Sequence, residues 1–200
     1  MTDPTLFQRV RLAREGAAVE RCHAHPHLMR YSVGHHTCDL LTLLTLCWQS
    51  DHNGQLPSAG LLVVASFHDV VERITGDLPS VTKHHTPWAD VVEDRALTRL
   101  GVGVEITDEE RDYLNAADSM EVWFWAREEL ARGNRAFVGW VDYYDNRWGG
   151  DDPAHWLPHA MNELWRQACM AGNGRMGMKE EREWAGDSPP SEGKQTEEAE

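Results

Sequence analysis

The chain has 200 residues, of which 41% are hydrophobic and 26% are charged, so it is long and apolar enough to fold around its own core. Its 33 acidic residues outnumber 19 lysines and arginines, which gives a formal net charge of −14. A protein that wraps duplex nucleic acid needs a surplus of basic residues to neutralise phosphates, so this composition excludes that class. A site for a small phosphorylated ligand is still compatible with this net negative charge, because such a site needs only a few basic residues in one cleft.

Membrane and redox features are scarce in the sequence. The longest apolar stretches, 40–48 and 61–67, fall far short of the roughly 20 residues that a helix needs to cross a bilayer. The first residues lack the apolar core of a secretion signal, so we expect a cytoplasmic protein without membrane contact. The cysteines show no metal-ligand spacing and are interpreted as buried thiols: Cys22, Cys38, Cys47 and Cys169.

The first half of the chain is patterned as helices. Amphipathic spacing predicts a first helix over 5–20, and apolar residues recur at helical spacing over 36–48. Ser58 is placed to cap a third helix, which we expect to continue to about residue 74.

The second half continues in the same way. We expect helices over 87–100, 137–144 and 154–171. Between the first two, the segment Thr107-Asp-Glu-Glu110 has the form of a capping box and opens a helix that runs through Arg132. Strand-like alternation is scarce, so the predicted fold class is all-α.

The C-terminal segment has a different composition. Residues 179–200 carry eight acids against three bases and two adjacent prolines. Such a segment cannot bury enough surface to offset the entropy of ordering, so we interpret it as a disordered acidic tail. The remaining residues, 1–178, are expected to form one domain.

Two histidines and two aspartates form the candidate site. His36 begins one apolar helix and His68 ends the apolar stripe of the next, so both imidazoles can face one interhelical gap. Asp69 follows directly, and Asp118 lies on the apolar side of a third helix, where a carboxylate is costly to bury unless it is paired or bound to a cation. Together they indicate a mixed nitrogen and oxygen site for a divalent first-row metal. Taken singly, each residue is more simply explained by a structural role.

Four ordered segments carry a more specific signal: Arg21, VGHHT (33–37), FHDVVERITGDLPSVTK (67–83) and NAADSMEVWFWAREELARGN (115–134). In these segments the chain resembles the HD-domain phosphohydrolases, and among them the bacterial 5′-deoxynucleotidase group, most strongly over 5–140. The resemblance implies an all-α HD-domain helical bundle with one divalent metal ion between helices, which is Co, Mn, Zn or Mg. It implies four metal ligands, namely His36, His68, Asp69 and Asp118.

Two carboxylates are expected to take part in catalysis. Glu72 is expected one helical turn after His68, where it can transfer a proton to or from the water or the leaving oxygen. The resemblance implies that Asp77 matches a family position that acts as a second acid or base or orients the substrate. The alternatives are that Glu72 only orients a metal ligand and that Asp77 only stops a helix, since Thr-Gly-Asp is a good turn.

Three further residues are expected to bind substrate. Arg21 can grip a phosphate with its fork of donors, and Lys83 can add a point charge, unless it is simply a solvated surface lysine. Cys22 stands where the family's deoxynucleotidases tend to carry a tryptophan that shapes the sugar pocket.

The expected activity is hydrolysis of (deoxy)nucleoside 5′-monophosphates by a metal-activated water. One alternative is a deoxynucleoside triphosphate (dATP) triphosphohydrolase of viral type that controls the nucleotide pool, which would place the protein in host cytoplasm. A second alternative is a catalytically silent HD-fold interaction protein. We also expect a homo-oligomer, to which the Trp-rich part after residue 140 contributes. Four tryptophans are interpreted as core or subunit contacts: Trp123, Trp125, Trp140 and Trp165.

Overall fold

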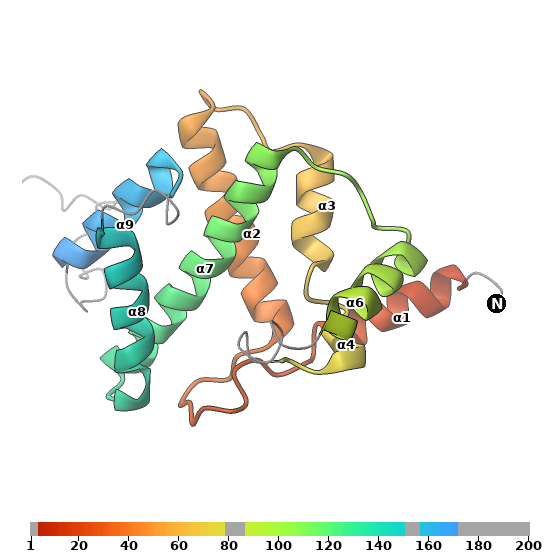
Figure 1. Ribbon diagram of the computed structural model, residues 1–200, viewed down its shortest axis with the longest axis horizontal. Helices are drawn as coiled ribbons and strands as arrows, with labels where there is room; N and C mark the ends of the chain where they lie inside the picture. The colour runs from red at the N-terminus through yellow and green to blue at the C-terminus, as the bar shows by residue number, and fades with distance from the viewer. Residues whose placement is uncertain (1–3, 79–86, 151–156, 172–200) are drawn as a thin grey trace, which may run out of the picture.

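The computed structural model describes residues 4–78, 87–150 and 157–171 (Figure 1). Within these ranges the regular structure is helical and contains no β-strand, which confirms the predicted all-α class. None of the helices in these ranges is long and apolar enough to cross a membrane. The predicted substrate ligand Lys83 and the acidic segment 179–200 lie outside the described residues.

The helices follow one another along the chain. They are α1 (Leu6–Gly16), α2 (Val33–Asp51), α3 (Ala59–Phe67), α4 (Glu72–Thr75), α6 (Pro87–Leu100), α7 (Asp108–Ala131), the 3-10 helix η1 (Arg135–Phe137), α8 (Val138–Gly149) and α9 (His159–Ala171).

Side-chain caps explain why several helices begin where they do. Ser32 and Ser58 accept a backbone N–H at the starts of α2 and α3. Thr5 forms a capping box at the start of α1. The capping box predicted at Thr107 is confirmed, because its hydroxyl accepts the Glu110 N–H while the Glu110 carboxylate accepts the Thr107 N–H. Each cap stabilises its helix by about 1 kcal/mol.

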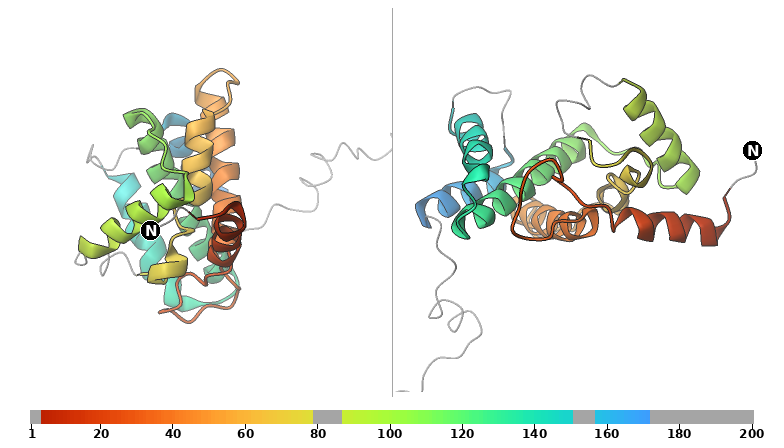
Figure 2. Two further views of the ribbon diagram at one scale, coloured as in Figure 1. Left: turned by 90° about the vertical axis from the view of Figure 1, so that its right-hand side faces the viewer. Right: turned by 90° about the horizontal axis from the view of Figure 1, so that it is seen from below.

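The long helices α2 and α7 pack against each other at the centre of the molecule, and α3 packs beside both (Figure 1). Helices α8 and α9 cover one end, while α1, α4 and α6 lie at the other end (Figure 2). The centre of this arrangement is where three separate parts of the sequence meet, and the candidate site lies there.

Two apolar clusters hold the helices together. The first joins α2, α3 and α7 through fully buried side chains such as Leu44, Leu61 and Met120. Burial of one such side chain contributes about 1.5–3 kcal/mol. The second cluster is aromatic and is built on Tyr31, Trp123, Trp125 and Phe137.

The tryptophans pack into this structure as predicted for core residues. The indole N–H groups of Trp123 and Trp165 both donate to Asp145 Oδ1 at 3.0 Å, which links α7, α8 and α9. The Trp125 ring stacks on Tyr31 with 4.2 Å between centroids. Trp140 packs against the same aromatic cluster.

Two predicted helix boundaries are wrong in an informative way. The third helix ends at Phe67 instead of near residue 74, and a new short helix starts at Glu72. The Val70 and Glu72 N–H groups bond to carbonyls three residues earlier, so the chain tightens into a turn. Buried Val70 and Val71 extend the apolar run across this break and hide it from the sequence pattern.

Other boundaries shift by a few residues. The first helix ends at Gly16 instead of residue 20, because the chain leaves it to form a backbone bridge between Glu20 and Ser32. Helix α8 continues to Gly149, five residues beyond its predicted end at 144.

Candidate metal centre

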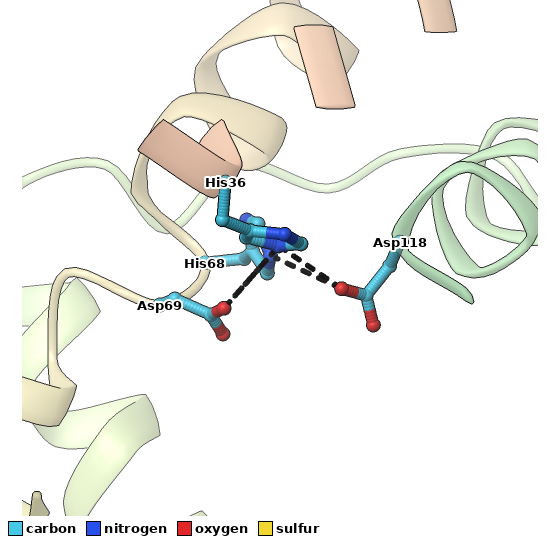
Figure 3. A group of neighbouring side chains, drawn as sticks. All are labelled: His36, His68, Asp69 and Asp118. Carbon is cyan, nitrogen blue, oxygen red and sulfur yellow. Dashed lines mark hydrogen bonds and ion pairs between the residues drawn. The ribbon is translucent and has the colours of Figure 1, made fainter. Parts of the chain in front are cut away.

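The four residues predicted as metal ligands come together in space (Figure 3). His36 projects from the first turn of α2, His68 and Asp69 from the turn after α3, and Asp118 from the middle of α7. One nitrogen or carboxylate oxygen from each lies within 4.8 Å of those of the other three. His36 Nε2 is 3.0 Å from Asp118 Oδ1 and 3.3 Å from His68 Nε2. Asp69 Oδ2 completes the group, 3.3 Å from His68 Nε2.

Hydrogen bonds at the opposite ring nitrogens orient both imidazoles. His68 Nδ1 donates to the Ala65 carbonyl oxygen at 2.8 Å. His36 Nδ1 lies 2.5 Å from Glu121 Oε2. Because Nδ1 is engaged in each ring, Nε2 is the nitrogen that faces the other ligands, as in metal-binding histidines generally.

Glu121 is a site residue that the sequence analysis missed. Its side chain is buried, and it also accepts a hydrogen bond from the Tyr31 hydroxyl. It lies three residues after Asp118 on α7, a spacing that places both carboxylates on one helix face. That spacing is the signal that could have revealed it, but the surrounding aromatic residues obscure which face of α7 is buried.

The donor set fits a divalent first-row metal ion. Two imidazole nitrogens and two carboxylate oxygens form a mixed set, and no thiolate belongs to it. Asp118 Oδ1 is itself buried, although part of the side chain reaches solvent. A buried carboxylate oxygen that faces two imidazoles is the arrangement expected where a cation is held.

The pKa shifts of His68 and Asp118 favour the forms that bind a cation, whereas the shift of His36 favours its protonated form. Burial lowers the pKa of His68 to about 4, so its imidazole is neutral and able to ligate. Burial alone would raise the pKa of Asp118, but His36 and His68 lower it well below its usual range. Burial likewise opposes the charged form of His36, yet its hydrogen bonds with Asp118 and Glu121 raise its pKa overall.

Arg21 lies directly beside the cluster. One terminal nitrogen of its guanidinium pairs with Asp69, and the other is 4.0 Å from Asp118 Oδ1. Its Nε is buried and has no hydrogen-bond partner among the described residues. Burial opposes its charge, but neighbouring acidic groups, including Asp118 and Glu72, raise its pKa. The predicted phosphate-binding arginine is therefore a permanent positive charge at the cluster.

The two predicted catalytic carboxylates have different surroundings. Glu72 is buried at the start of α4. Its carboxylate is close enough to Arg21 to raise the pKa of the arginine. Asp77 accepts the Cys22 N–H at 2.7 Å and lies 3.5 Å from His23 Nδ1. Asp77 thus holds the backbone next to Arg21, and the structure places it outside the group of four ligands.

Cys22 adopts a strained backbone conformation. Its φ is +55°, in the left-handed region that residues other than glycine rarely adopt. The hydrogen bond from its N–H to Asp77 helps to hold this conformation. Its side chain is half-buried, and burial raises the pKa of the thiol to about 12, so the thiol is neutral.

Comparisons with known proteins find a distant similarity to nucleotide-processing enzymes. The chain is 27% identical over 105 residues to the 5′-deoxynucleotidases of Yersinia pestis (strain Pestoides F) and Yersinia pseudotuberculosis (serotype O:3, strain YPIII). The match covers 43% of this chain and 53% of each relative, so it spans about half the length of these proteins. This similarity supports a distant relationship. No protein-family model matches the chain.

Proposed function

We propose that the protein is a metal-dependent phosphohydrolase that removes the 5′-phosphate from deoxynucleoside monophosphates. The observation that carries this proposal is the convergence of two imidazoles and two carboxylates from three separate segments of the chain. The distant similarity to 5′-deoxynucleotidases supports the choice of substrate.

His36, His68, Asp69 and Asp118 would hold the metal in this proposal. A divalent ion supplies two effects when bound, since it lowers the pKa of water and polarises a phosphoryl oxygen. Glu121 and the Ala65 carbonyl fix the two imidazole rings, so the ligands need little rearrangement when the ion binds.

Arg21 and Glu72 would act on the substrate. The unpartnered Nε–H of Arg21 gives a donor for a phosphate oxygen, and its charge stabilises the negative charge of the phosphoryl group. The Glu72 carboxylate would take a proton from the attacking water or return one to the leaving 5′ oxygen. Asp77 would act as a positioning residue, because it holds the Cys22 backbone beside Arg21.

Product analysis tests the proposal. The full chain, supplied with Mn²⁺ or Co²⁺, is incubated with deoxynucleoside monophosphates, ribonucleoside monophosphates and deoxynucleoside triphosphates, and the products are separated by chromatography. His68→Ala is the inactivating variant, and His35→Ala is its matched control, because His35 is an exposed imidazole next to a proposed ligand. We expect deoxynucleoside and inorganic phosphate from the wild type and His35→Ala, and neither from His68→Ala.

Other products would assign a different function. Release of deoxynucleoside and tripolyphosphate from dATP, without turnover of monophosphates, would replace the proposal with a triphosphohydrolase. An absence of turnover on every substrate by metal-loaded protein would contradict both activities and favour a catalytically silent interaction protein.

A further inference from the structure

A cavity of about 670 Å³ is lined mainly by residues of α1 and α6. These two helices lie at the end of the molecule opposite α8 and α9 (Figure 2). The size of the cavity is within the range typical of small-molecule sites. The described residues that line it include none of the metal cluster and none of the other predicted site residues. It is therefore separate from the site that carries the proposed function.

Three arginines give this cavity a positive charge. Arg9 comes from α1, while Arg95 and Arg99 lie four residues apart on one face of α6. No aspartate or glutamate is found among its described lining residues. Within the described part of the chain, no ion pair joins any of these arginines to a carboxylate. Such a cluster is unexpected in a chain with a net charge of −14.

The spacing of the two α6 arginines carries an energetic cost. Like charges at i and i+4 on a helix repel each other and destabilise it. Both side chains are exposed at the rim of the cavity. A bound anion would neutralise the two charges and remove their repulsion.

Arg9 lies deeper in the cavity wall. Its Nε is buried and has no hydrogen-bond partner among the described residues. Its guanidinium lies over Gly101, whose φ is +70°, and a Cβ at that position would come within 2.9 Å of Arg9 Nη2. The absence of a side chain at Gly101 thus leaves the space that the Arg9 guanidinium occupies. The Arg9 Nε–H is the donor without a partner among the described residues.

The rest of the wall is apolar. Leu12, Ile74, Val92 and Ala96 line the cavity between the arginines. We propose that this cavity binds a phosphate-bearing small molecule with a ring-sized apolar body, which is the chemistry of a nucleotide. The arginines bind the phosphate oxygens with paired N–H donors, and the apolar wall covers the ring.

Isothermal titration calorimetry of the full chain in EDTA tests this site, with dAMP, dATP and inorganic pyrophosphate as probes. The test variant is Arg95→Ala/Arg99→Ala. Its matched control, Arg111→Ala/Arg135→Ala, removes the same charge at two exposed positions elsewhere. We expect the test variant to bind dAMP or dATP at least about tenfold more weakly than the wild type, and the control to bind like the wild type. Arg21→Ala should lose only the nucleotide binding that occurs at the metal cluster, and it should keep the binding that Arg95→Ala/Arg99→Ala weakens, because Arg21 does not line this cavity.

Several results would overturn the proposal. They are an absence of binding by the wild type, an equal loss in the control variant, and a loss that occurs only in Arg21→Ala. If pyrophosphate binds as tightly as the nucleotides, the proposed contact between the apolar wall and the ring of the ligand is wrong. If circular dichroism shows that the double variant is unfolded, Arg95→Glu at a single exposed position replaces it with the same expected loss.

Discussion

Glu121 Oε2 lies 2.5 Å from His36 Nδ1, and both side chains are buried between α2 and α7. The same Glu121 oxygen accepts the hydroxyl of Tyr31, whose ring stacks on Trp125. The aromatic cluster and the candidate metal centre are therefore connected through one carboxylate. This contact fixes both the tautomer and the ring orientation of His36.

Glu121→Gln is expected to weaken metal binding while it leaves the four ligands in place. An outer carboxylate that holds a ligating histidine typically contributes 10–100-fold to metal affinity or activity, so we expect a loss of about that size. Competition with a metal-chelating dye measures the affinity. Glu128→Gln, at an exposed position on the same helix, is the matched control. Equal affinities for both variants would mean that Glu121 has no part in the site.

Arg21→Ala is expected to reduce turnover with little change in metal content. The guanidinium carries the positive charge closest to the proposed ligands, so its removal should lower kcat/KM on deoxynucleoside monophosphates by about 100-fold. Steady-state kinetics and metal analysis of the same preparation check this. Arg30→Ala, an exposed arginine in the same loop, should behave like the wild type. A variant with normal kinetics would remove Arg21 from substrate binding.

Gly16→Ala should destabilise the protein and disturb the metal centre. A Cβ on Gly16 would lie 2.3 Å from the Val70 carbonyl oxygen, and Val70 directly follows the proposed ligand Asp69. We expect a loss of about 1–3 kcal/mol in the free energy of unfolding, together with weaker metal binding. Gly139→Ala is the control, because its Cβ meets nothing within 4 Å and the change should stabilise α8 by about 0.5–1 kcal/mol. Urea denaturation measures the change in the free energy of unfolding for each variant. Changes of the same sign for Gly16→Ala and Gly139→Ala would contradict the close contact at Val70.

Glu129 should contribute stability that depends on pH. It accepts hydrogen bonds from the Leu28 and Met29 N–H groups and from Asn134 Nδ2. Burial alone would raise the pKa of Glu129, but these hydrogen bonds lower it overall. The contribution is therefore fully present above the unfolded pKa of about 4.3 and is lost as the pH falls through the lower folded pKa.

Glu129→Gln tests this contribution. At neutral pH the variant should lose about 1–3 kcal/mol in the free energy of unfolding, because buried donors lose a charged acceptor. The difference from the wild type should stay constant between about pH 7 and pH 5 and should shrink as the pH is lowered from about 4.3 toward 2. Urea denaturation across this range measures it, and a difference that does not change with pH would show that the charge of Glu129 contributes nothing.

The sequence predicted those features that depend on local pattern. The Thr107 capping box and the helix α2 follow from the sequence, because each pattern is encoded within one or two helical turns. The His36, His68, Asp69 and Asp118 group was anticipated from the motifs, and these four side chains lie together.

Features that depend on contacts between distant segments could not be predicted. The break between Phe67 and Glu72 is hidden because the buried residues Val70 and Val71 continue the apolar pattern beyond it, and at this break the chain passes close to Gly16. Glu121 faces His36 only because α2 and α7 cross at that point. The charged cavity joins Arg9 to two arginines more than 80 residues later in the sequence, and no local pattern connects them.

Metal stoichiometry tests the central claim most directly. Three proteins are compared: the wild type, His68→Ala and His35→Ala. Each is dialysed against Mn²⁺, Co²⁺ or Zn²⁺, excess ion is removed, and the bound metal is measured by elemental mass spectrometry. The cluster predicts about one bound ion per chain for the wild type and His35→Ala, and almost none for His68→Ala. A full equivalent retained by His68→Ala, or no bound ion in the wild type with any of the three metals, would contradict the assignment of these residues as a metal centre.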